Sequence, residues 1–301
     1  MVSRPSIYVL IVAWVALFGG AAFAQPNLPS PPDPNESPTS DTADTEWESR
    51  LTSRLSVSQA AYKDWQEGGL NSLAFTASLD GATEHVGDRW TQAYDMKLAI
   101  GYINQEGREI RKSEDRIRLQ GNLQYNGEDF FQRFNPTIAA DLRTQFASGF
   151  DYEQDPPVET SAFFAPATLT QSLGLTYDPY ESLSLRLGAA SKQTIVTEED
   201  FRVLYGVDED NLLRAEAGGQ FSAALDQRLS DNIRYQSQLD VFLAVNQLEN
   251  PPDVIWENTI NMAVNDWITT NLEFVALYDK NTTDAIQLKE VISVGVSLTI
   301  L

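Results

Sequence analysis

The last strand-like segment of the chain limits its fold more than any other stretch. From residue 292 onward, apolar side chains occupy every second position and small or polar side chains lie between them. The apolar row is Ile292, Val294, Val296, Leu298 and Ile300, and the other row is Ser293, Gly295, Ser297 and Thr299. Because successive side chains of a β-strand point to opposite faces, this segment has one apolar and one polar face. A final strand of this kind is typical of a transmembrane β-barrel, which closes on itself.

The same period of two recurs throughout the chain after residue 50. Alternating segments lie at residues 72–80, 94–102, 116–125, 138–146, 169–177, 183–189, 213–226, 233–243, 256–264 and 268–279. A short first strand near Leu55 and Val57 and the final strand bring the total to twelve, an even number as in single-chain bacterial barrels. We therefore predict an all-β fold, a closed antiparallel up-and-down transmembrane β-barrel of about twelve strands.

The predicted connections alternate between short and long. Gaps 84–89, 126–129, 178–182, 227–232 and 265–266 are short, whereas gaps 105–115, 147–165 and 196–210 are longer. Short periplasmic turns and longer external loops are the pattern of outer-membrane barrels. Aromatic residues at the strand ends predict two girdles at the headgroup level. The periplasmic girdle would hold Trp90, Tyr125, Tyr177, Tyr180, Tyr235 and Trp267, and the other would hold Tyr62, Tyr102, Phe146, Trp256 and Tyr278.

The N-terminus has the anatomy of an export signal. Arg4 precedes an apolar core at residues 7–18, and Ala22-Phe23-Ala24 forms a small-residue cleavage site. We predict a signal peptide over residues 1–24, with an uncleaved membrane anchor as the alternative. Six prolines then fall within residues 25–46, so residues 25–50 are expected to form a disordered periplasmic tail. The barrel domain would occupy residues 51–301.

Composition excludes several classes of function. The chain has 21 basic and 43 acidic residues and a net charge of −22, which argues against binding to nucleic acid. It has no cysteine and a single histidine, so neither a disulfide framework nor a zinc site of several His or Cys ligands is available. A high-salt habitat and loops that bind divalent cations are two explanations of the acidity. After residue 24 there is no apolar run of helical-span length.

Five short stretches carry a family resemblance. They are Trp65–Asn71 (WQEGGLN), Arg143–Phe150 (RTQFASGF), Phe164–Leu169 (FAPATL), Trp256–Met262 (WENTINM) and Gln287–Gly295 (QLKEVISVG). In this order and spacing the chain resembles the bacterial outer-membrane proteins grouped as domain-of-unknown-function family 3078 (DUF3078), over residues 51–301. One departure is the final Leu301, where outer-membrane strands commonly end in an aromatic residue. The resemblance implies a barrel and an outer-membrane location, and it supplies no catalytic residue.

The main chemical constellation is a set of charged side chains on the polar strand faces, which we expect to point into the lumen. They are Asp95, Lys97, Arg116, Arg118, Asp141, Arg143, Arg186, Arg214, Glu216, Arg234, Asp240, Glu257, Glu273 and Glu290. In one interpretation they form a charged constriction that selects solutes. In the other they are an ion-pair network that fills a narrow barrel, because an enclosed charge must be paired or hydrated.

Other candidate sites are weaker. His85 is predicted to lie in a periplasmic turn, where it is a solvated residue rather than a general base. The acidic runs Glu198-Glu199-Asp200 and Asp208-Glu209-Asp210 lack the glycine-spaced pattern of a calcium loop. We therefore predict no catalytic residue, cofactor or metal site. The expected partners are outer-membrane lipid, the barrel-insertion machinery and a small solute.

The function predicted from sequence is that of a non-enzymatic outer-membrane barrel, either a narrow passive channel or a structural barrel. Two alternatives belong to other classes. One is an outer-membrane hydrolase acting at the barrel rim, which requires a rim histidine or an activated carboxylate pair. The other is a secreted soluble β-barrel that binds an apolar ligand inside.

Overall fold

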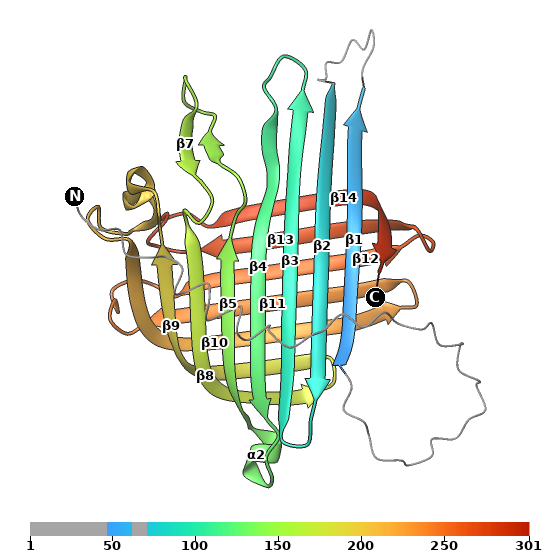
Figure 1. The fold of residues 1–301 in the computed structure, drawn as a ribbon, viewed down its shortest axis with the longest axis vertical. Coiled ribbons are helices and arrows are strands. Elements are labelled where there is room, and N and C mark those ends of the chain that lie inside the picture. The colour runs from blue at the N-terminus through green and yellow to red at the C-terminus, as the bar shows by residue number, and fades with distance from the viewer. Residues whose placement is uncertain (1–46, 62–70, 301) are drawn as a thin grey trace. The chain divides into compact units, whose positions relative to one another are not determined.

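The computed structural model describes residues 47–61 and 71–300, which form one closed antiparallel barrel of twelve strands (Figure 1). The predicted signal peptide and most of the predicted tail lie outside the described residues. The barrel strands are β1 (Trp47–Ala60), β2 (Ser72–Val86), β3 (Trp90–Gln105), β4 (Arg111–Tyr125), β5 (Asn135–Thr144), β8 (Ala167–Tyr180), β9 (Leu183–Ile195), β10 (Leu213–Ser230), β11 (Ile233–Ala244), β12 (Asp253–Ala263), β13 (Ile268–Tyr278) and β14 (Gln287–Thr299).

Each barrel strand pairs with its neighbours in the chain, and β14 pairs with β1 to close the ring. This up-and-down order confirms the predicted fold class and strand number. In Figure 1, β1 to β5 run nearly upright while β11 to β14 cross behind them at a steep angle, as expected when the strands of a barrel tilt against its axis. The first strand is longer than predicted, because β1 already begins at Trp47.

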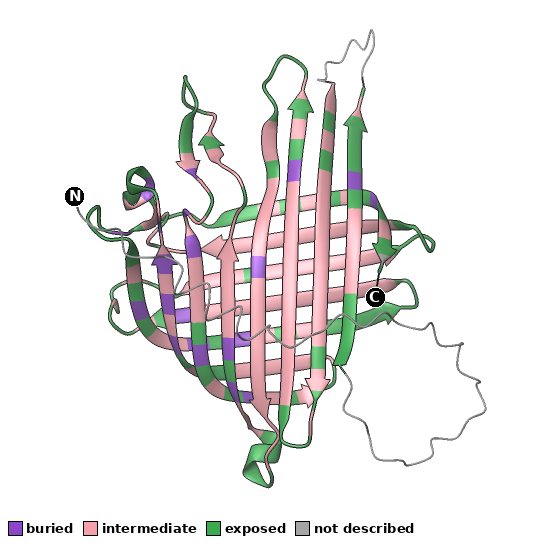
Figure 2. Cartoon of the chain, viewed as in Figure 1, coloured by how far each residue is buried: buried purple, intermediate pink, exposed green. Residues whose placement is uncertain are grey.

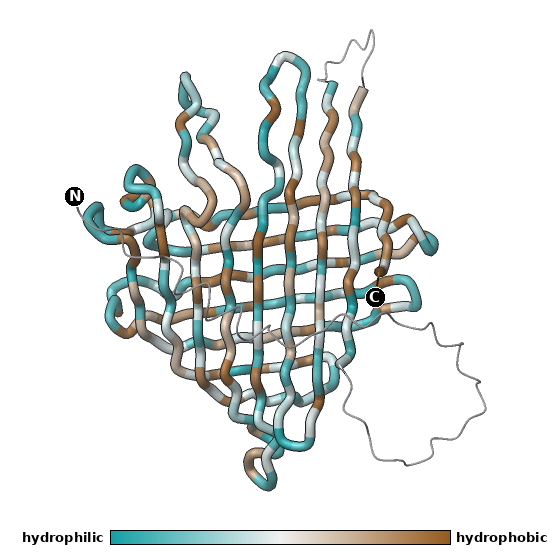
Figure 3. The backbone as a smooth tube through the Cα atoms, viewed as in Figure 1, coloured by the Kyte–Doolittle hydropathy of each residue, from teal (hydrophilic) through white to brown (hydrophobic). Residues whose placement is uncertain are grey.

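The apolar row of each strand faces outward. Leu55 and Val57 of β1 and Ile292 of β14 are 54%, 56% and 67% exposed, although they lie in the middle of strands. The buried strand positions are instead mostly polar, including Arg118, Thr137, Ser172, Lys192, Glu216 and Gln220. Figures 2 and 3 show this alternation of exposure and hydropathy along the strands. An apolar exterior around a polar interior is the arrangement of a transmembrane β-barrel, which confirms the predicted direction of the two faces.

The two ends of the barrel differ in their connections. The turn end carries the short connections after β2, β8, β10 and β12, together with a four-residue helix, α2 (Phe130–Arg133), after β4. The loop end carries the longer connections, which hold a hairpin of β6 (Gly149–Asp151) and β7 (Val158–Ser161) and two 3-10 turns, η1 (Glu199–Phe201) and η2 (Val203–Tyr205). The predicted alternation of short and long gaps holds except around β4, where the predicted long gap at 105–115 shrinks to residues 106–110 and the predicted short gap at 126–129 grows to residues 126–134. The helix α2, the hairpin and the 3-10 turns were not predicted.

Two loop-end connections pack on each other through a small apolar core. It consists of Ala165, Val196, Phe201 and Val207, with Tyr205 packed against it. The Tyr205 hydroxyl donates to the Thr160 carbonyl oxygen at 3.1 Å and so ties the two connections together. In the part of the chain that the structure describes, no helix is long and apolar enough to cross a membrane.

Candidate functional site: the ion-paired lumen

Three groups of charged side chains cross the interior of the barrel. The central cluster consists of Arg118, Asp141, Arg143, Asp240 and Glu257. The loop-side cluster consists of Lys192, Arg214, Glu216, Asp253 and Asp279. The third, called here the seam-side cluster, consists of Glu114, Arg116, Glu273 and Lys289. Every cluster includes at least one pair from strands that are not neighbours in the sheet, so each cluster links separate walls of the barrel.

Arg118 is the centre of the central cluster. This side chain lies on β4, is only 2% exposed, and donates from Nη2 to Asp141 Oδ2 on β5 at 2.6 Å. Its Nη1 also donates to Glu257 on β12, which stands six strands away in the ring of twelve and therefore on the opposite wall. The Arg118 guanidinium thus spans the lumen.

Arg143 and polar neighbours complete the central cluster. Arg143 Nη2 lies 3.2 Å from Asp141 Oδ2 and 3.2 Å from Asp240 Oδ2, so it too bridges β5 and β11. Ser222 Oγ donates to Asp240 Oδ1 at 2.8 Å, and Gln120 Nε2 donates to Asp141 Oδ2 at 3.1 Å. Two guanidiniums therefore face three carboxylates, and Asp141 and Asp240 also accept hydrogen bonds from neutral donors. Such satisfaction is needed because an unpaired enclosed charge costs several kcal/mol.

The loop-side cluster is built around Lys192 on β9. Its Nζ lies 2.6 Å from Asp253 Oδ2 on β12 and 2.8 Å from Asp279 Oδ2, just after β13. Glu216, which is 2% exposed, accepts a hydrogen bond at Oε2 from Arg214 Nε at 3.2 Å. Burial alone would raise the pKa of Asp279. Lys192 and the Asn281 backbone N–H outweigh it and hold the pKa of this carboxyl below its usual value.

The seam-side cluster lies near the strands that close the barrel. Arg116 on β4 pairs with Glu114 at 3.1 Å and also with Glu273 on β13. Lys289 on β14 pairs with Glu114 at 2.5 Å and with Glu273 at 3.3 Å. Two cations and two carboxylates therefore alternate across the lumen, which neutralises all four charges.

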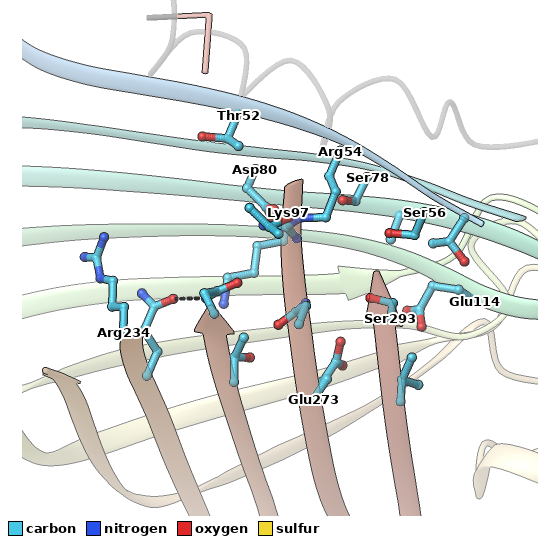
Figure 4. Close-up of a pocket in the computed structure, with 18 of the residues that line it drawn as sticks. Thr52, Arg54, Ser56, Ser78, Asp80, Lys97, Glu114, Arg234, Glu273 and Ser293 are labelled. Atoms are coloured by element: carbon cyan, nitrogen blue, oxygen red, sulfur yellow. Dashed lines mark hydrogen bonds and ion pairs between the residues drawn. The ribbon is translucent and has the colours of Figure 1, made fainter. Parts of the chain in front are cut away.

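The lumen is hollow between these clusters and the turn end. A cavity of about 510 Å³ is lined by the inward faces of β1 to β4 and β12 to β14 and by the β10–β11 turn at residues 231–232. In Figure 4, Arg54, Asp80 and Lys97 on one wall face Arg234 and Glu273 on the other. A second cavity of about 320 Å³ reaches the β8–β9 turn at residues 181–182. The half of the lumen nearest the turn end therefore contains the two cavities, and the side chains of the charged clusters fill the lumen toward the loop end.

The structure places the predicted lumen residues in several groups. Asp141, Arg143, Arg118, Asp240 and Glu257 meet in the central cluster, Arg214 and Glu216 in the loop-side cluster, and Arg116 and Glu273 in the seam-side cluster. Asp95 and Lys97 line both cavities. Arg186 donates to Asn122 Oδ1 at 2.8 Å, and Arg234 pairs with Asp226 at 2.5 Å near the turn end.

One predicted lumen residue was wrong, and several participants were missed. Glu290 is exposed and shares the outward row of β14 with Leu288 and Ile292, whereas its neighbour Lys289 points inward to Glu114. The sequence interpretation also omitted Lys192, Asp253, Asp279, Glu114 and Lys289. The predicted segment before Lys192 stopped at residue 189, but the strand continues to residue 195, and its period of two places the Lys192 side chain inward.

The weaker candidates remain apart from these clusters. His85 lies at the end of β2 rather than in the following turn, and its ring contacts Trp47 at a centroid distance of 5.0 Å. It is therefore far from the loop-end rim, where the hydrolase alternative needs a base. The acidic runs at 198–200 and 208–210 are exposed, and within the described residues no group of three or more His, Cys, Asp or Glu side chains is placed to hold a metal ion. The polar interior also contradicts the alternative of a soluble barrel that binds an apolar ligand inside.

Two solved structures are similar to the chain over most of its length. The chain is similar to the translocator domain of the autotransporter NalP from Neisseria meningitidis, at 11% identity, 83% and 86% coverage of the two chains and a TM-score of 0.35. It is also similar to the COG4313 outer membrane channel from Pseudomonas putida F1, at 10% identity, 87% and 99% coverage and a TM-score of 0.37. Similarity at this level carries no argument about function, and no curated protein matches the sequence.

The family comparison addresses the resemblance noted in the sequence. Two of the five stretches that carry it, at residues 65–71 and 143–150, fall inside the matched part of the chain, and the other three lie beyond it. The family described as "Protein of unknown function (DUF3078)" matches residues 57–150, which confirms the resemblance from the end of β1 to the start of β6.

Proposed function

We propose that this protein is an outer-membrane barrel that lets small solutes pass through a narrow, ion-lined lumen. The observation that carries the proposal is the Arg118 contact from β4 to Glu257 on the opposite wall. A polar interior that is hollow on one side of this contact supports a hydrated path, and the central cluster crosses this path. Rings of charged side chains of this kind select solutes in other pores.

The arrangement of charges in the central cluster supports a channel of restricted permeability. On one wall Lys97, Arg118 and Arg143 are in register on β3, β4 and β5. On the facing wall Asp240 and Glu257 supply carboxylates from β11 and β12. A solute must replace these cross-lumen ion pairs with its own polar groups, or pass beside them. Small, hydrated solutes are therefore the class that fits.

Conductance in planar bilayers tests the proposal. The wild-type protein, refolded in detergent, should form small channels, and Arg118→Ala combined with Glu257→Ala should raise the single-channel conductance because it removes the contact across the lumen. Glu290→Gln is the matched control, since this carboxylate faces outward. A wild-type protein and a double variant that both fail to conduct at any voltage would reduce the barrel to a structural role.

A further inference from the structure

The seam between the first and last strands is the shortest in the barrel. β1 and β14 share five register pairs, from Thr52↔Thr299 to Ser56↔Gly295, whereas the next shortest seam, β4–β5, has eight. If the register continued, Val57 would oppose Val294 and Ser58 would oppose Ser293. Instead β1 stays paired with β2 as far as Ala60, and β14 stays paired with β13 from Gln287. The two edges therefore separate toward the loop end.

The separated edges lie at the level of the apolar exterior. Leu288, Ile292 and Val294 on the β14 side are 67%, 67% and 53% exposed, and Val57 on the β1 side is 56% exposed. Backbone N–H and C=O groups on an open strand edge cannot be left without partners in hydrocarbon. A gap at this depth therefore needs an occupant that supplies polar groups on the inner side and apolar surface on the outer side.

The larger cavity reaches this gap. Its lining includes the inward-facing Ser56, Ser58 and Ser293 and also Val57 and Ile292, whose side chains belong to the outward rows. The cavity therefore reaches the lumen side of the gap between β1 and β14.

The inner part of this cavity contains polar groups without close partners. Arg54 Nε, Thr269 Oγ1 and Asn271 Oδ1 are buried without a hydrogen-bond partner in the described structure, and all three residues line the cavity. Arg54 Nη1 lies 3.9 Å from Oδ2 of Asp80, its ion-pair partner. Lys97 has no hydrogen bond or ion pair within the described residues, and the carboxylates whose charges interact with it are those of Asp95 and Glu257. Of the other acids of the cavity wall, Glu114 and Glu273 are neutralised by Arg116 and Lys289, and Asp231 lies in the β10–β11 turn.

We propose that the β1–β14 gap is a lateral binding site for a single-chain amphiphile with a carboxylate head, such as a long-chain fatty acid. The head binds Arg54 and Lys97 and receives hydroxyl hydrogen bonds from Ser56 and Ser58. The chain leaves through the wall between Val57 and Ile292 and lies along the apolar exterior. Charge-assisted hydrogen bonds to a carboxylate suit two basic groups that lack a close partner. The cavity volume of about 510 Å³ is within the usual range for small-molecule sites.

This site goes beyond axial conduction and rests only on the barrel spanning a bilayer. The test uses a fatty acid with a photoreactive diazirine in its chain, added to vesicles that contain the full-length protein, and maps the labelled residues by mass spectrometry. Labelling should include the inward positions Ser58 and Ser293 as well as the outward residues Val57 and Ile292 that flank the gap. Ser293→Trp fills the cavity and should abolish the inward labelling. Leu187→Trp, on the outward face of β9, should leave it unchanged.

A second variant separates head recognition from ordinary contact with lipid. Arg54→Gln should reduce labelling by the fatty acid at least about tenfold, the effect of losing one hydrogen bond to a charged group. Labelling of Arg54→Gln by the alcohol of equal chain length should change little. Arg228→Gln, at the turn end of the same cavity, is the control for loss of a positive charge and should leave labelling by the fatty acid unchanged. If Ser293→Trp fails to fold, Ser58→Trp replaces it.

The outcomes distinguish the two proposals. Labelling confined to outward positions all round the barrel, or equal labelling by acid and alcohol in wild type and Arg54→Gln, would overturn the lateral site and leave the channel proposal standing. Dimers cross-linked through the β1 and β14 edges would also overturn it, because a second chain would then occupy the gap. A non-conducting barrel with inward labelling would keep the lateral site and refute the channel.

Discussion

The guanidinium of Arg118 on β4 hydrogen-bonds the carboxylate of Glu257 on β12, directly across the barrel. Around this contact Arg143, Asp141 and Asp240 complete a network in which every charge has an opposite partner. The lumen is thereby divided into a hollow turn half and a closed section. Both the proposed restricted passage and the stability of the barrel depend on this division.

Removing Arg118 should destabilise the barrel strongly. Arg118→Met leaves Asp141, Asp240 and Glu257 with only Arg143 to compensate them, and breaking an enclosed ion network from one side costs about 3–5 kcal/mol. Urea unfolding in lipid vesicles measures the free energy of unfolding. Lys280→Ala, which removes an exposed pair with Asp284 in a loop, should change it by less than about 1 kcal/mol. Equal effects of the two substitutions would contradict the role assigned to Arg118.

Glycine at position 295 should be required for closure of the barrel. A Cβ atom at Gly295 would lie 2.6 Å from the Leu55 carbonyl oxygen and 2.6 Å from Ser56 Oγ, in the short seam between β1 and β14. Gly295→Ala should therefore cost about 1–3 kcal/mol of stability through overpacking, seen as a lower unfolding temperature in a gel-shift assay. Gly219→Ala is the matched control, because its nearest atom is 3.8 Å away. A Gly295→Ala barrel as heat-resistant as the control would contradict this account of the seam.

The period-two alternation in the sequence predicted the strands and their two faces. It did not predict contacts that form only when distant strands come together in the closed barrel. The alternation around Ile292 gave the strand, its two faces and the barrel. The same alternation places Glu290 in the outward row, because it lies two residues from Ile292 and therefore on the same face of the strand. The start of β1 at Trp47 was missed because residues 47–50 show no apolar alternation. The pairing of Arg118 with Glu257, 139 residues apart, depends on barrel closure and tilt, which no local pattern records.

Cations should be favoured over anions at the loop end. The connection at residues 145–166 carries four acidic and no basic side chains, and the one at 196–212 carries six acidic and one basic. Such a rim raises the local cation concentration. Neutralising Glu153, Asp155, Glu159, Glu209 and Asp210 should lower the potassium-to-chloride permeability ratio roughly threefold at 0.1 M salt and hardly at all at 1 M, where the Debye length is about 3 Å.

The reversal potential in a potassium chloride gradient measures this ratio. A matched control neutralises five acidic residues at the turn end instead, Asp88, Glu128, Asp129, Glu181 and Asp266, and should have the smaller effect. A wild-type channel that prefers chloride would contradict the assignment of selectivity to the loop-end rim.

Acid should weaken the pairing of Lys192 with Asp279 in the loop-side cluster. The pKa of Asp279 is lowered in the folded state, so this carboxyl contributes stability that is present above its unfolded pKa of about 3.9 and lost as the pH falls through its folded value. Lys192→Gln removes the main favourable partner of Asp279 and should flatten the dependence of the free energy of unfolding on pH below about pH 4. Unfolding titrations at a series of pH values check this, and an unchanged slope in Lys192→Gln would rule out the coupling.

The direction of the two strand faces is the claim on which all the others depend, and cysteine scanning of residues 73–78 on β2 tests it most directly. The natural chain has no cysteine, so each single substitution reports one position. In lipid vesicles, a fluorophore attached to a cysteine at position 73 or 75 should be quenched by a lipid-borne quencher, because Leu73 and Phe75 face outward. Cysteines at positions 74, 76 and 78 should instead react with a water-soluble thiol reagent that enters through the turn-end cavity. The reverse pattern, or reactivity without a period of two, would contradict a polar lumen inside an apolar wall.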